Sequence, residues 1–334
     1  MNLTEGFNAA AGALCELGLI ADGEQFAIRA LPGGVSCDVY EVHTKKRAFC
    51  VKRALAKLRV EADWRAAPER NHAEVAWMEL VASIDPKWVP KILGEDRARH
   101  LFVMEYLPPE TYPVWKSLLA AGKADAGFAA KVGDAIARIH AATAGHEDIA
   151  RAFANQEQFH ALRLDAYLLH TAARHSDVGE TLRALARGVG EARIALMHGD
   201  VSPKNILNGP EGPVFLDAET GCYGDPAFDL AFCLNHLLLK GVWHREDAAA
   251  YAASFAALKD AYFAKADWEP HDGLERRTAA LLAAFLLARI DGKSPVEYIT
   301  EESDKDFVRA TAETFLKAGL TLDEMLAHWT EALV

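Results

Sequence analysis

The stretch MHGDVSPKN, residues 197–205, decides the fold that this sequence predicts. The apolar residues before it indicate a strand that ends near Asp200, and the Ser-Pro pair behind Asp200 prevents that strand from continuing. Asn205 then enters a short apolar run, and the turn GPEGP folds the chain back into VFLDAE, residues 214–219. We therefore expect a hairpin whose open end holds Asn205 and Asp217 beside Asp200.

Three oxygen-bearing side chains at one end of a hairpin point to metal and proton chemistry. Oxygens from Asn205 and Asp217 are hard ligands suited to Mg²⁺, which keeps several waters and takes its other ligands from phosphates. Asp200 is then left to accept a proton from a hydroxyl group. The alternative is that the Asp and Asn side chains cap turns. Either one alone favours turn capping, whereas the three together favour a site.

Composition restricts the class of protein. With 334 residues the chain can bury a full core and is long enough for two domains or lobes. Its content of 51% hydrophobic and 25% charged residues is ordinary for a globular protein. The net charge of -12 argues against nucleic acid or an anionic membrane as the main partner.

Cysteine usage and the apolar runs indicate the compartment. The five cysteines form no Cys-x-x-Cys pair, so we expect reduced thiols and no structural metal. The amino terminus lacks the basic segment of a signal peptide. The longest apolar run, near residues 279–288, has about half the length that a membrane span needs. We expect a cytoplasmic protein.

Hydrophobic periodicity predicts an α+β chain. The first part alternates short strand patterns with turns, holds one helix pattern over residues 67–84, and breaks at Pro108-Pro109. Beyond that break the periodicity is helical almost throughout, and AFDLAFCLNHLLL is apolar nearly all round, as in a buried helix. We expect a small antiparallel-sheet lobe over residues 1–107 and a larger, mainly helical lobe over residues 108–334.

HGDVSPKN, followed by the Asp of LDAE, resembles the catalytic and metal-binding motifs of the aminoglycoside phosphotransferase and choline kinase-like family. These small-molecule kinases are relatives of the protein kinases. The resemblance implies a bilobal protein kinase-like fold that uses ATP and Mg²⁺. It assigns catalysis to Asp200 and metal binding to Asn205 and Asp217, with Glu219 able to reach a metal directly or through water.

The resemblance also implies a nucleotide site in the first lobe. Gly33, Gly34 and Ser36 lie where a phosphate-covering loop belongs, although a Gly-Gly pair between strands is more often a plain hairpin turn. Lys52 emerges from an apolar strand face and therefore needs an anion. ATP phosphates supply one, and Glu74 on the following helix supplies another.

Three details of this site stay open. Glu69 and Glu79 are fallback partners for Lys52, and Glu74 would otherwise lie on a solvated face. FVMEYL places Met104, Glu105, Tyr106 and Leu107 where the family holds adenine, and a plain edge strand is compatible with the same residues. In GDPAFDLA, Asp229 is expected to accept hydrogen bonds from the catalytic-loop backbone, with His198 as a further support of that loop.

The motifs of this sequence differ from those of protein kinases, and the differences restrict the class of acceptor. LDAE replaces Asp-Phe-Gly, no Ala-Pro-Glu motif follows it, and only a few residues separate LDAE from GDPAFDL. No long activation loop fits there, which disfavours peptide substrates. We expect an ATP- and Mg²⁺-dependent kinase that phosphorylates a hydroxyl of a small molecule. The alternative is an inactive nucleotide-binding module that acts through partners.

The acceptor is the least defined part of the prediction. An aminoglycoside would need a dense acidic patch, but the candidate acids have other expected roles, and the basic residues of ERR and ARIDGK favour a neutral or anionic acceptor. We therefore expect a sugar-like or other hydroxylated metabolite. Arg289, Asp291 and Lys293 either touch the substrate or cap a helix. The sequence does not indicate the oligomeric state.

Overall fold

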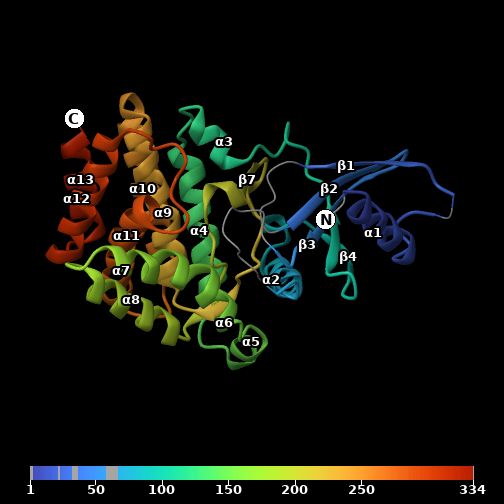
Figure 1. The fold of residues 1–334 in the computed structure, drawn as a ribbon, viewed down its shortest axis with the longest axis horizontal. Coiled ribbons are helices and arrows are strands. Elements are labelled where there is room, and N and C mark those ends of the chain that lie inside the picture. Colours follow the sequence, from blue (N-terminus) through green and yellow to red (C-terminus); the bar gives the residue numbers. More distant parts are fainter. Residues whose placement is uncertain (1–2, 22, 32–36, 58–66, 334) are drawn as a thin grey trace. The chain divides into compact units, whose positions relative to one another are not determined.

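The structure is a computed structural model that describes residues 3–21, 23–31, 37–57 and 67–333 (Figure 1). The expected phosphate-covering residues Gly33, Gly34 and Ser36 lie outside the described residues. The chain divides into two compact units. Unit 1 comprises Met1–Tyr112 and Leu216–Glu219, and unit 2 comprises Pro113–Phe215 and Thr220–Val334. The lobe boundary expected at residues 107 and 108 stays a prediction.

Unit 1 is built on a five-stranded antiparallel sheet. Its strand order is β1-β2-β3-β5-β4. The strands are β1 (Phe26–Ala30), β2 (Cys37–Thr44), β3 (Ala48–Ala54), β4 (Ile92–Asp96) and β5 (Leu101–Glu105), and the helices are α1 (Leu3–Glu16), α2 (Arg70–Ile84) and the 3-10 turn η1 (Pro86–Trp88). The expected α+β class is confirmed.

The two faces of the sheet serve different purposes. Helix α1, which the sequence-based prediction lacks, packs Ala13 and Leu14 against Tyr40, Val42 and Val51 on one face. Because successive strand residues point to opposite faces, Lys52 faces away from α1. Helix α2 contacts β3 and β5 on that other face and so reaches Lys52. The face toward α1 is therefore mainly apolar, and the other face carries the buried Lys52.

Unit 2 is mainly helical and holds two short antiparallel pairs. The pairs are β6 (Ala195–Met197) with β9 (Cys222–Gly224) and β7 (Ile206–Gly209) with β8 (Gly212–Phe215). The second pair is the hairpin that the sequence predicts. The helices are α3 (Trp115–Ala120), α4 (Ala126–Thr143), α5 (Glu147–Ala152), α6 (Gln156–Phe159), the π-helix η2 (His160–Leu169), α7 (His170–Arg174), α8 (Gly179–Glu191), η3 (Pro203–Asn205), α9 (Pro226–Trp243), η4 (Arg245–Asp247), α10 (Ala248–Phe263), α11 (His271–Asp291), α12 (Glu302–Ala318) and α13 (Leu322–Leu333).

Helix α9 is the centre of unit 2. It packs against α10 and α11, and α12 covers α11 from the other side (Figure 1). All of its residues from Pro226 to Val242 are buried, as its all-round apolar sequence predicts. Among the described residues, none of the helices has both the length and the apolar character needed to cross a membrane.

Candidate active site

Lys52 and Glu74 form a buried ion pair in unit 1. Lys52 Nζ lies 2.8 Å from Glu74 Oε1 and 2.7 Å from Oε2, and it also contacts Asp217 Oδ1. Burial by itself lowers the pKa of the Lys52 ammonium, but the charges of Asp217 and Glu74 outweigh burial and raise the pKa well above its ordinary value. Glu74 is thus the partner of Lys52, and the fallback partners Glu69 and Glu79 are not needed to balance its charge. A role of the pair in nucleotide binding stays a prediction.

The segment Leu216–Glu219 carries Asp217 into unit 1. Asp217 has a φ of 67°, a left-handed conformation that a non-glycine residue adopts only when its surroundings hold it there. Its backbone N–H donates to Glu74 Oε1 at 3.1 Å, so the glutamate that pairs with Lys52 also fixes this backbone. The Asp217 carboxylate keeps 26% of its surface exposed. It is therefore held in place yet open to a ligand.

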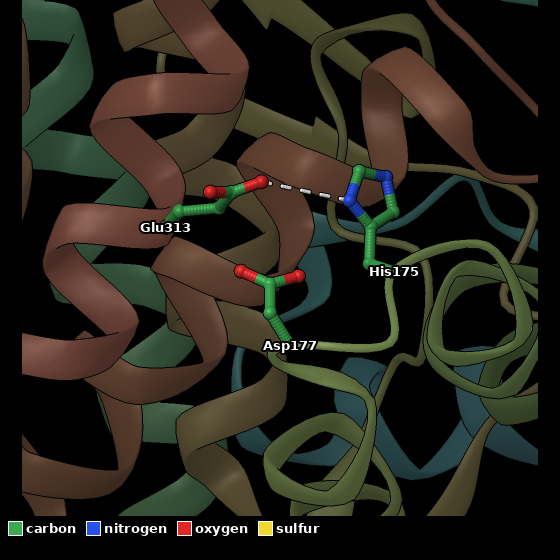
Figure 2. A group of neighbouring side chains, drawn as sticks. All are labelled: His175, Asp177 and Glu313. Carbon is green, nitrogen blue, oxygen red and sulfur yellow. Dashed lines mark ion pairs between the residues drawn. The ribbon is translucent and has the colours of Figure 1, made fainter.

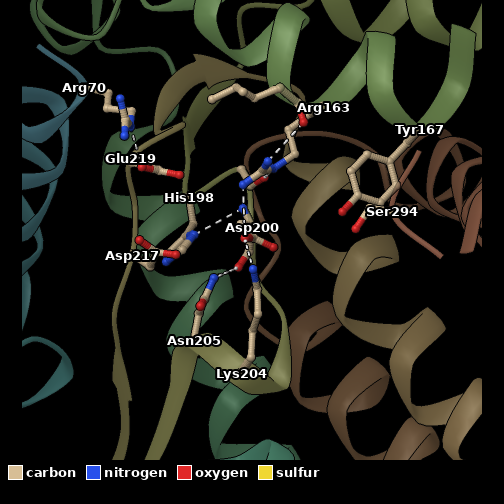
Figure 3. Close-up of polar contacts among 12 residues, drawn as sticks. Arg70, Arg163, Tyr167, His198, Asp200, Lys204, Asn205, Asp217, Glu219 and Ser294 are labelled. Carbon is tan, nitrogen blue, oxygen red and sulfur yellow. Dashed lines mark hydrogen bonds and ion pairs between the residues drawn. The ribbon is translucent and has the colours of Figure 1, made fainter. Parts of the chain in front are cut away.

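Arg70 is a site residue that the sequence reading missed. Its Nε donates to Glu219 Oε2 at 2.8 Å (Figure 3). Its Nη2 donates to the carbonyl of Leu55 at 2.8 Å. Arg70 and Glu74 are four residues apart on α2, so they lie on one side of that helix and hold the same segment at two points. This spacing was the available signal. Oε2 of Glu219 already accepts a hydrogen bond from Arg70. Metal binding by Glu219 stays a prediction.

In unit 2 the expected catalytic loop, residues 198–205, follows β6 and is held by Asp229. The two carboxylate oxygens of Asp229 accept the backbone N–H groups of His198 at 2.6 Å and Gly199 at 2.9 Å. Asp229 is fully buried, and His140 Nε2 lies 3.3 Å from it. The ring of His198 accepts the backbone N–H of Asp200 through Nδ1 at 3.2 Å. Both residues thus contact the loop backbone, which is the arrangement expected for a supporting role.

Gly199 is required by the shape of this loop. Its φ is 77°, and a Cβ atom built on it would lie 2.7 Å from Thr220 Oγ1 and 2.8 Å from the Thr220 carbonyl oxygen. Any side chain at this position would therefore be strained and would collide with backbone. The glycine allows the chain to turn closely past Thr220 immediately before Asp200.

Asp200 is a buried carboxylate between two cations. Its Oδ2 lies 3.0 Å from Arg163 Nη2 and 3.1 Å from Lys204 Nζ (Figure 3). Burial alone would raise the pKa of Asp200, but Lys204 and Arg163 outweigh burial and hold the pKa well below its usual value. Arg163 also donates from Nε to the carbonyl of Gly199 at 2.7 Å. Sequence reading missed Arg163, because it lies in a π-helix remote from the motif.

Asn205 supports the loop and offers an oxygen. Its side-chain N–H donates to the carbonyl of Asp200 at 3.1 Å, which directs the amide nitrogen inward and leaves the amide oxygen as the acceptor for a cation. Amide and carboxylate oxygens are the donor types that suit Mg²⁺. Asn205 belongs to unit 2 and Asp217 to unit 1, so their joint binding of one metal ion stays a prediction.

The expected adenine segment lies at the end of β5. Met104 pairs with Cys50 of β3 and is 7% exposed. The backbone N–H of Glu105 donates to the carbonyl of Lys91 at 2.9 Å, and the strand ends there. Tyr106 and Leu107 follow outside the sheet. The structure gives their place, while contact with a nucleotide stays a prediction.

A second group of potential metal ligands lies in unit 2, away from the catalytic loop. Figure 2 shows His175, Asp177 and Glu313 converging. Lys317 Nζ lies 3.0 Å from Asp177 and 3.7 Å from Glu313, and His175 Nε2 lies 3.0 Å from Asp291. Lys317 thus already contacts both carboxylates. This cluster therefore fits an ion-pair network between α12 and the chain after α7 better than a metal site.

The structure thus contains a sheet with a buried Lys52–Glu74 pair and, in unit 2, a loop with a buried Asp200. Residues 27–274 match the phosphotransferase enzyme family, and the chain belongs to this family.

Individual relatives are distant. Methylthioribose kinase 1 and methylthioribose kinase 2 of Oryza sativa subsp. japonica are 24% and 22% identical over 228 residues, which cover 60% of this chain. The match spans 53% of each relative, which is about half of its length.

Solved structures agree on the fold. A choline/ethanolamine kinase family protein from Mesorhizobium loti has a TM-score of 0.53 at 18% identity, over 97% of this chain and 99% of its own. Choline kinase from Cryptosporidium parvum Iowa II has a TM-score of 0.54 at 9% identity, over 96% of this chain and 99% of its own. At such identities the likeness shows the fold alone, and it confirms the protein kinase-like fold that the resemblance implies.

Proposed function

We propose that this protein transfers a phosphoryl group from ATP to a hydroxyl group of a small molecule, with Mg²⁺ as cofactor. The observation that carries the proposal is the buried Asp200, whose Oδ2 lies between Arg163 and Lys204 in a loop that Asp229 holds by accepting the His198 and Gly199 N–H groups. Membership of the phosphotransferase enzyme family supports it. Positioning and charge stabilisation account for most of the catalysis of phosphoryl transfer, so a few well-held residues are sufficient.

Asp200 orients the acceptor hydroxyl. Arg163 and Lys204 both contact Oδ2, so Oδ1 is the oxygen proposed to accept the hydrogen bond from the hydroxyl. A carboxylate whose pKa is this low is a weak base before the reaction begins. It therefore aligns the hydroxyl oxygen and takes up its proton as the new oxygen–phosphorus bond forms.

Asn205 and Asp217 would hold magnesium, with Glu219 as a further candidate ligand. The metal would neutralise charge on the phosphates. Arg70 keeps Glu219 in position, and Glu74 keeps Asp217 in position. Lys52 is proposed to contact the phosphates.

The rest of the nucleotide site is assigned on the resemblance alone. We propose that Gly33, Gly34 and Ser36 cover the phosphates and that Met104, Glu105, Tyr106 and Leu107 line the adenine.

For the acceptor we propose a sugar-like or other hydroxylated metabolite over an aminoglycoside. The similarity to two methylthioribose kinases supports a sugar-like acceptor. The net charge of -12 disfavours nucleic acid or an anionic membrane as a partner, and we propose a cytoplasmic location. An inactive nucleotide-binding module is the alternative. The presence of Lys52, Asp200, Asn205 and Asp217 argues against it.

The test compares Asp200→Asn with the matched control Asp148→Asn. Asp148 is 93% exposed on α5 and pairs only with neighbouring Arg151 among the described contacts. ATP consumption is measured with a panel of hydroxylated metabolites. Asp200→Asn is expected to lower kcat by about 10² to 10⁴ while MgATP affinity stays unchanged, and Asp148→Asn is expected to match the wild type. Wild-type-like turnover in folded Asp200→Asn would overturn the assignment.

A further inference from the structure

Two buried cations of unit 2 lack a carboxylate partner among the residues that the structure describes. Lys240 is 1% exposed and Arg289 is 8% exposed. Among the described residues, neither forms an ion pair, and Lys240 Nζ and Arg289 Nε have no hydrogen-bond partner. The buried cations Lys52, Arg70 and Arg163 each pair with a carboxylate instead. Burying an ammonium group costs several kcal/mol, so an unpaired buried charge calls for an explanation.

Aromatic rings surround Lys240 but do not replace a counterion. Its Nζ lies 4.3 Å from the ring centre of Tyr298 and 5.0 Å from that of Trp243, and the two rings stack at 4.8 Å. A cation–π contact contributes about 2 kcal/mol when desolvated, less than the burial costs. Burial accordingly lowers the pKa of Lys240 to about 8. Glu297, the nearby carboxylate, contacts Lys116.

Arg289 connects this region to the catalytic loop. Its Nη1 lies 3.3 Å from the Tyr167 hydroxyl and 3.1 Å from Ser294 Oγ and also donates to the Ser294 carbonyl, so the two hydroxyls share one neighbourhood (Figure 3). Its Nε is the atom without a hydrogen-bond partner among the described residues. Tyr167 lies four residues after Arg163 on the π-helix η2, and Arg163 binds Asp200. The contacts therefore lead from Asp200 through one helix to Arg289.

His236 lies on α9, the helix that also carries Lys240. It is 7% exposed and lies one turn before Lys240 on α9. Burial lowers its pKa well below the usual value, Arg289 and Lys240 lower it further, and the charge of Asp200 acts in the opposite direction. The His236 ring lies 5.7 Å from the Phe232 ring, which lies 5.3 Å from the ring of Tyr167, the residue that Arg289 contacts. The backbone N–H of Val296 donates to the Arg289 carbonyl at 2.8 Å, two residues before Tyr298, whose ring lies beside Lys240. These contacts link Lys240 to Arg289, and Arg289 through η2 to Asp200.

We propose that the acceptor carries an anionic group, a carboxylate or a phosphate monoester, which Arg289 and Lys240 bind while Asp200 faces the acceptor hydroxyl. This inference rests on the proposed function and specifies its substrate class. The anion is the counterion that Lys240 and Arg289 lack among the described residues. The Tyr167 and Ser294 hydroxyls can donate further hydrogen bonds to it. The same cations would repel the ammonium groups of an aminoglycoside.

Anion binding is tested first without turnover. The unfolding temperature of the ligand-free protein is followed while inorganic phosphate or acetate is added at constant ionic strength. At least one of the two anions is expected to raise the unfolding temperature of the wild type and of the exposed control Lys123→Met. The same anion is expected to shift the unfolding temperature of Lys240→Met at least tenfold less. A rise with phosphate but not with acetate would indicate that the acceptor carries a phosphate monoester. A rise with acetate but not with phosphate would indicate a carboxylate. Equal responses of Lys240→Met and wild type to both anions would overturn the proposal.

Turnover provides the second readout. Hydroxylated acids and sugar phosphates are compared with their amides and with the unphosphorylated sugars. An anionic acceptor is expected to have a kcat/KM at least 100-fold above that of its neutral counterpart. Lys240→Met and Arg289→Lys are expected to raise its KM at least tenfold with little change in MgATP affinity. A neutral acceptor that is used equally well, with an unchanged KM in both variants, would contradict the inference but leave the kinase assignment intact.

The two failures can be distinguished. If no acceptor is phosphorylated and MgATP does not bind, the proposed function fails, whereas the anion titration still reports on Lys240 and Arg289. Lys240→Met is expected to fold, because removing an unpaired buried charge leaves no partner stranded. A ligand-free Lys240→Met that unfolds well below the wild type would show that Lys240 has a structural counterion and would count against the proposal.

Discussion

Arg70 and Glu219 form an ion pair of 2.8 Å whose side chains are 0% and 8% exposed. The pair joins the start of α2 to the segment that carries Asp217. One turn further along α2, Glu74 accepts the backbone N–H of Asp217. Helix α2 therefore determines the position of Asp217 in unit 1, and its contacts are open to direct test.

Arg70→Met is expected to destabilise the protein by about 3 to 5 kcal/mol, because it removes the 2.8 Å ion pair of the buried Glu219 carboxylate. The double variant Arg70→Met/Glu219→Gln is expected to recover a large part of that loss. Urea unfolding measures both. Arg97→Met is the control, since the Arg97 side chain is 73% exposed and surface ion pairs contribute about 1 kcal/mol at most. A double variant as unstable as the single one would contradict a pair that acts as a unit.

Gly199→Ala is expected to destabilise the catalytic loop and to reduce turnover. The new Cβ would meet the Thr220 carbonyl oxygen at 2.8 Å, and the φ of 77° is unfavourable for alanine. Gly188→Ala is the matched control. Gly188 is exposed within α8 and has open space around it, so alanine should stabilise that helix by up to about 1 kcal/mol. Thermal unfolding and kcat of both variants give the comparison. A harmless Gly199→Ala would show that the loop adapts.

The contribution of Asp200 to stability is expected to depend on pH. Its pKa in the folded protein is depressed, so its stabilising effect is present above the unfolded pKa of about 3.9 and is lost as the pH falls further. The difference in unfolding free energy between wild type and Asp200→Asn should therefore be constant near neutral pH and shrink below about pH 4. Urea titrations across this range measure it. A difference that grows on acidification would contradict the depressed pKa.

Asn205→Ala and Asp217→Ala are expected to disturb the dependence of activity on Mg²⁺, because each removes one proposed oxygen ligand. The Mg²⁺ concentration for half-maximal rate should rise about tenfold or more, in the range found when a group that supports a metal site is lost. Asn208→Ala, on β7 of the same hairpin, serves as the control. Removal of free metal with EDTA should abolish the rate in all three. An unchanged Mg²⁺ requirement in both ligand variants would refute the assignment.

Local patterns in the sequence predicted much of the fold. Alternating and helical periodicity indicated the strands of unit 1, helix α2 and the buried helix α9, and the GPEGP turn indicated the hairpin of β7 and β8. These features depend on residues close in the chain, where turn chemistry and hydrophobic spacing act directly. Helix α1 and the π-helix η2 were not predicted, since their existence depends on packing against distant elements.

For the site, the sequence by itself determined which residue types are present and in what order: Lys52, Glu74, Asp200, Asn205 and Asp217. Only the tertiary structure showed that Arg70 binds Glu219 and that Arg163 binds Asp200. It also showed that Lys240 and Arg289 are buried with no carboxylate partner within the described part of the chain. A charge has no fixed pKa and no partner until the chain folds, because burial and neighbouring charges depend on residues that are far apart in the sequence. The motif therefore defines the chemistry, and packing decides which charges are neutralised and which stay available to bind a ligand.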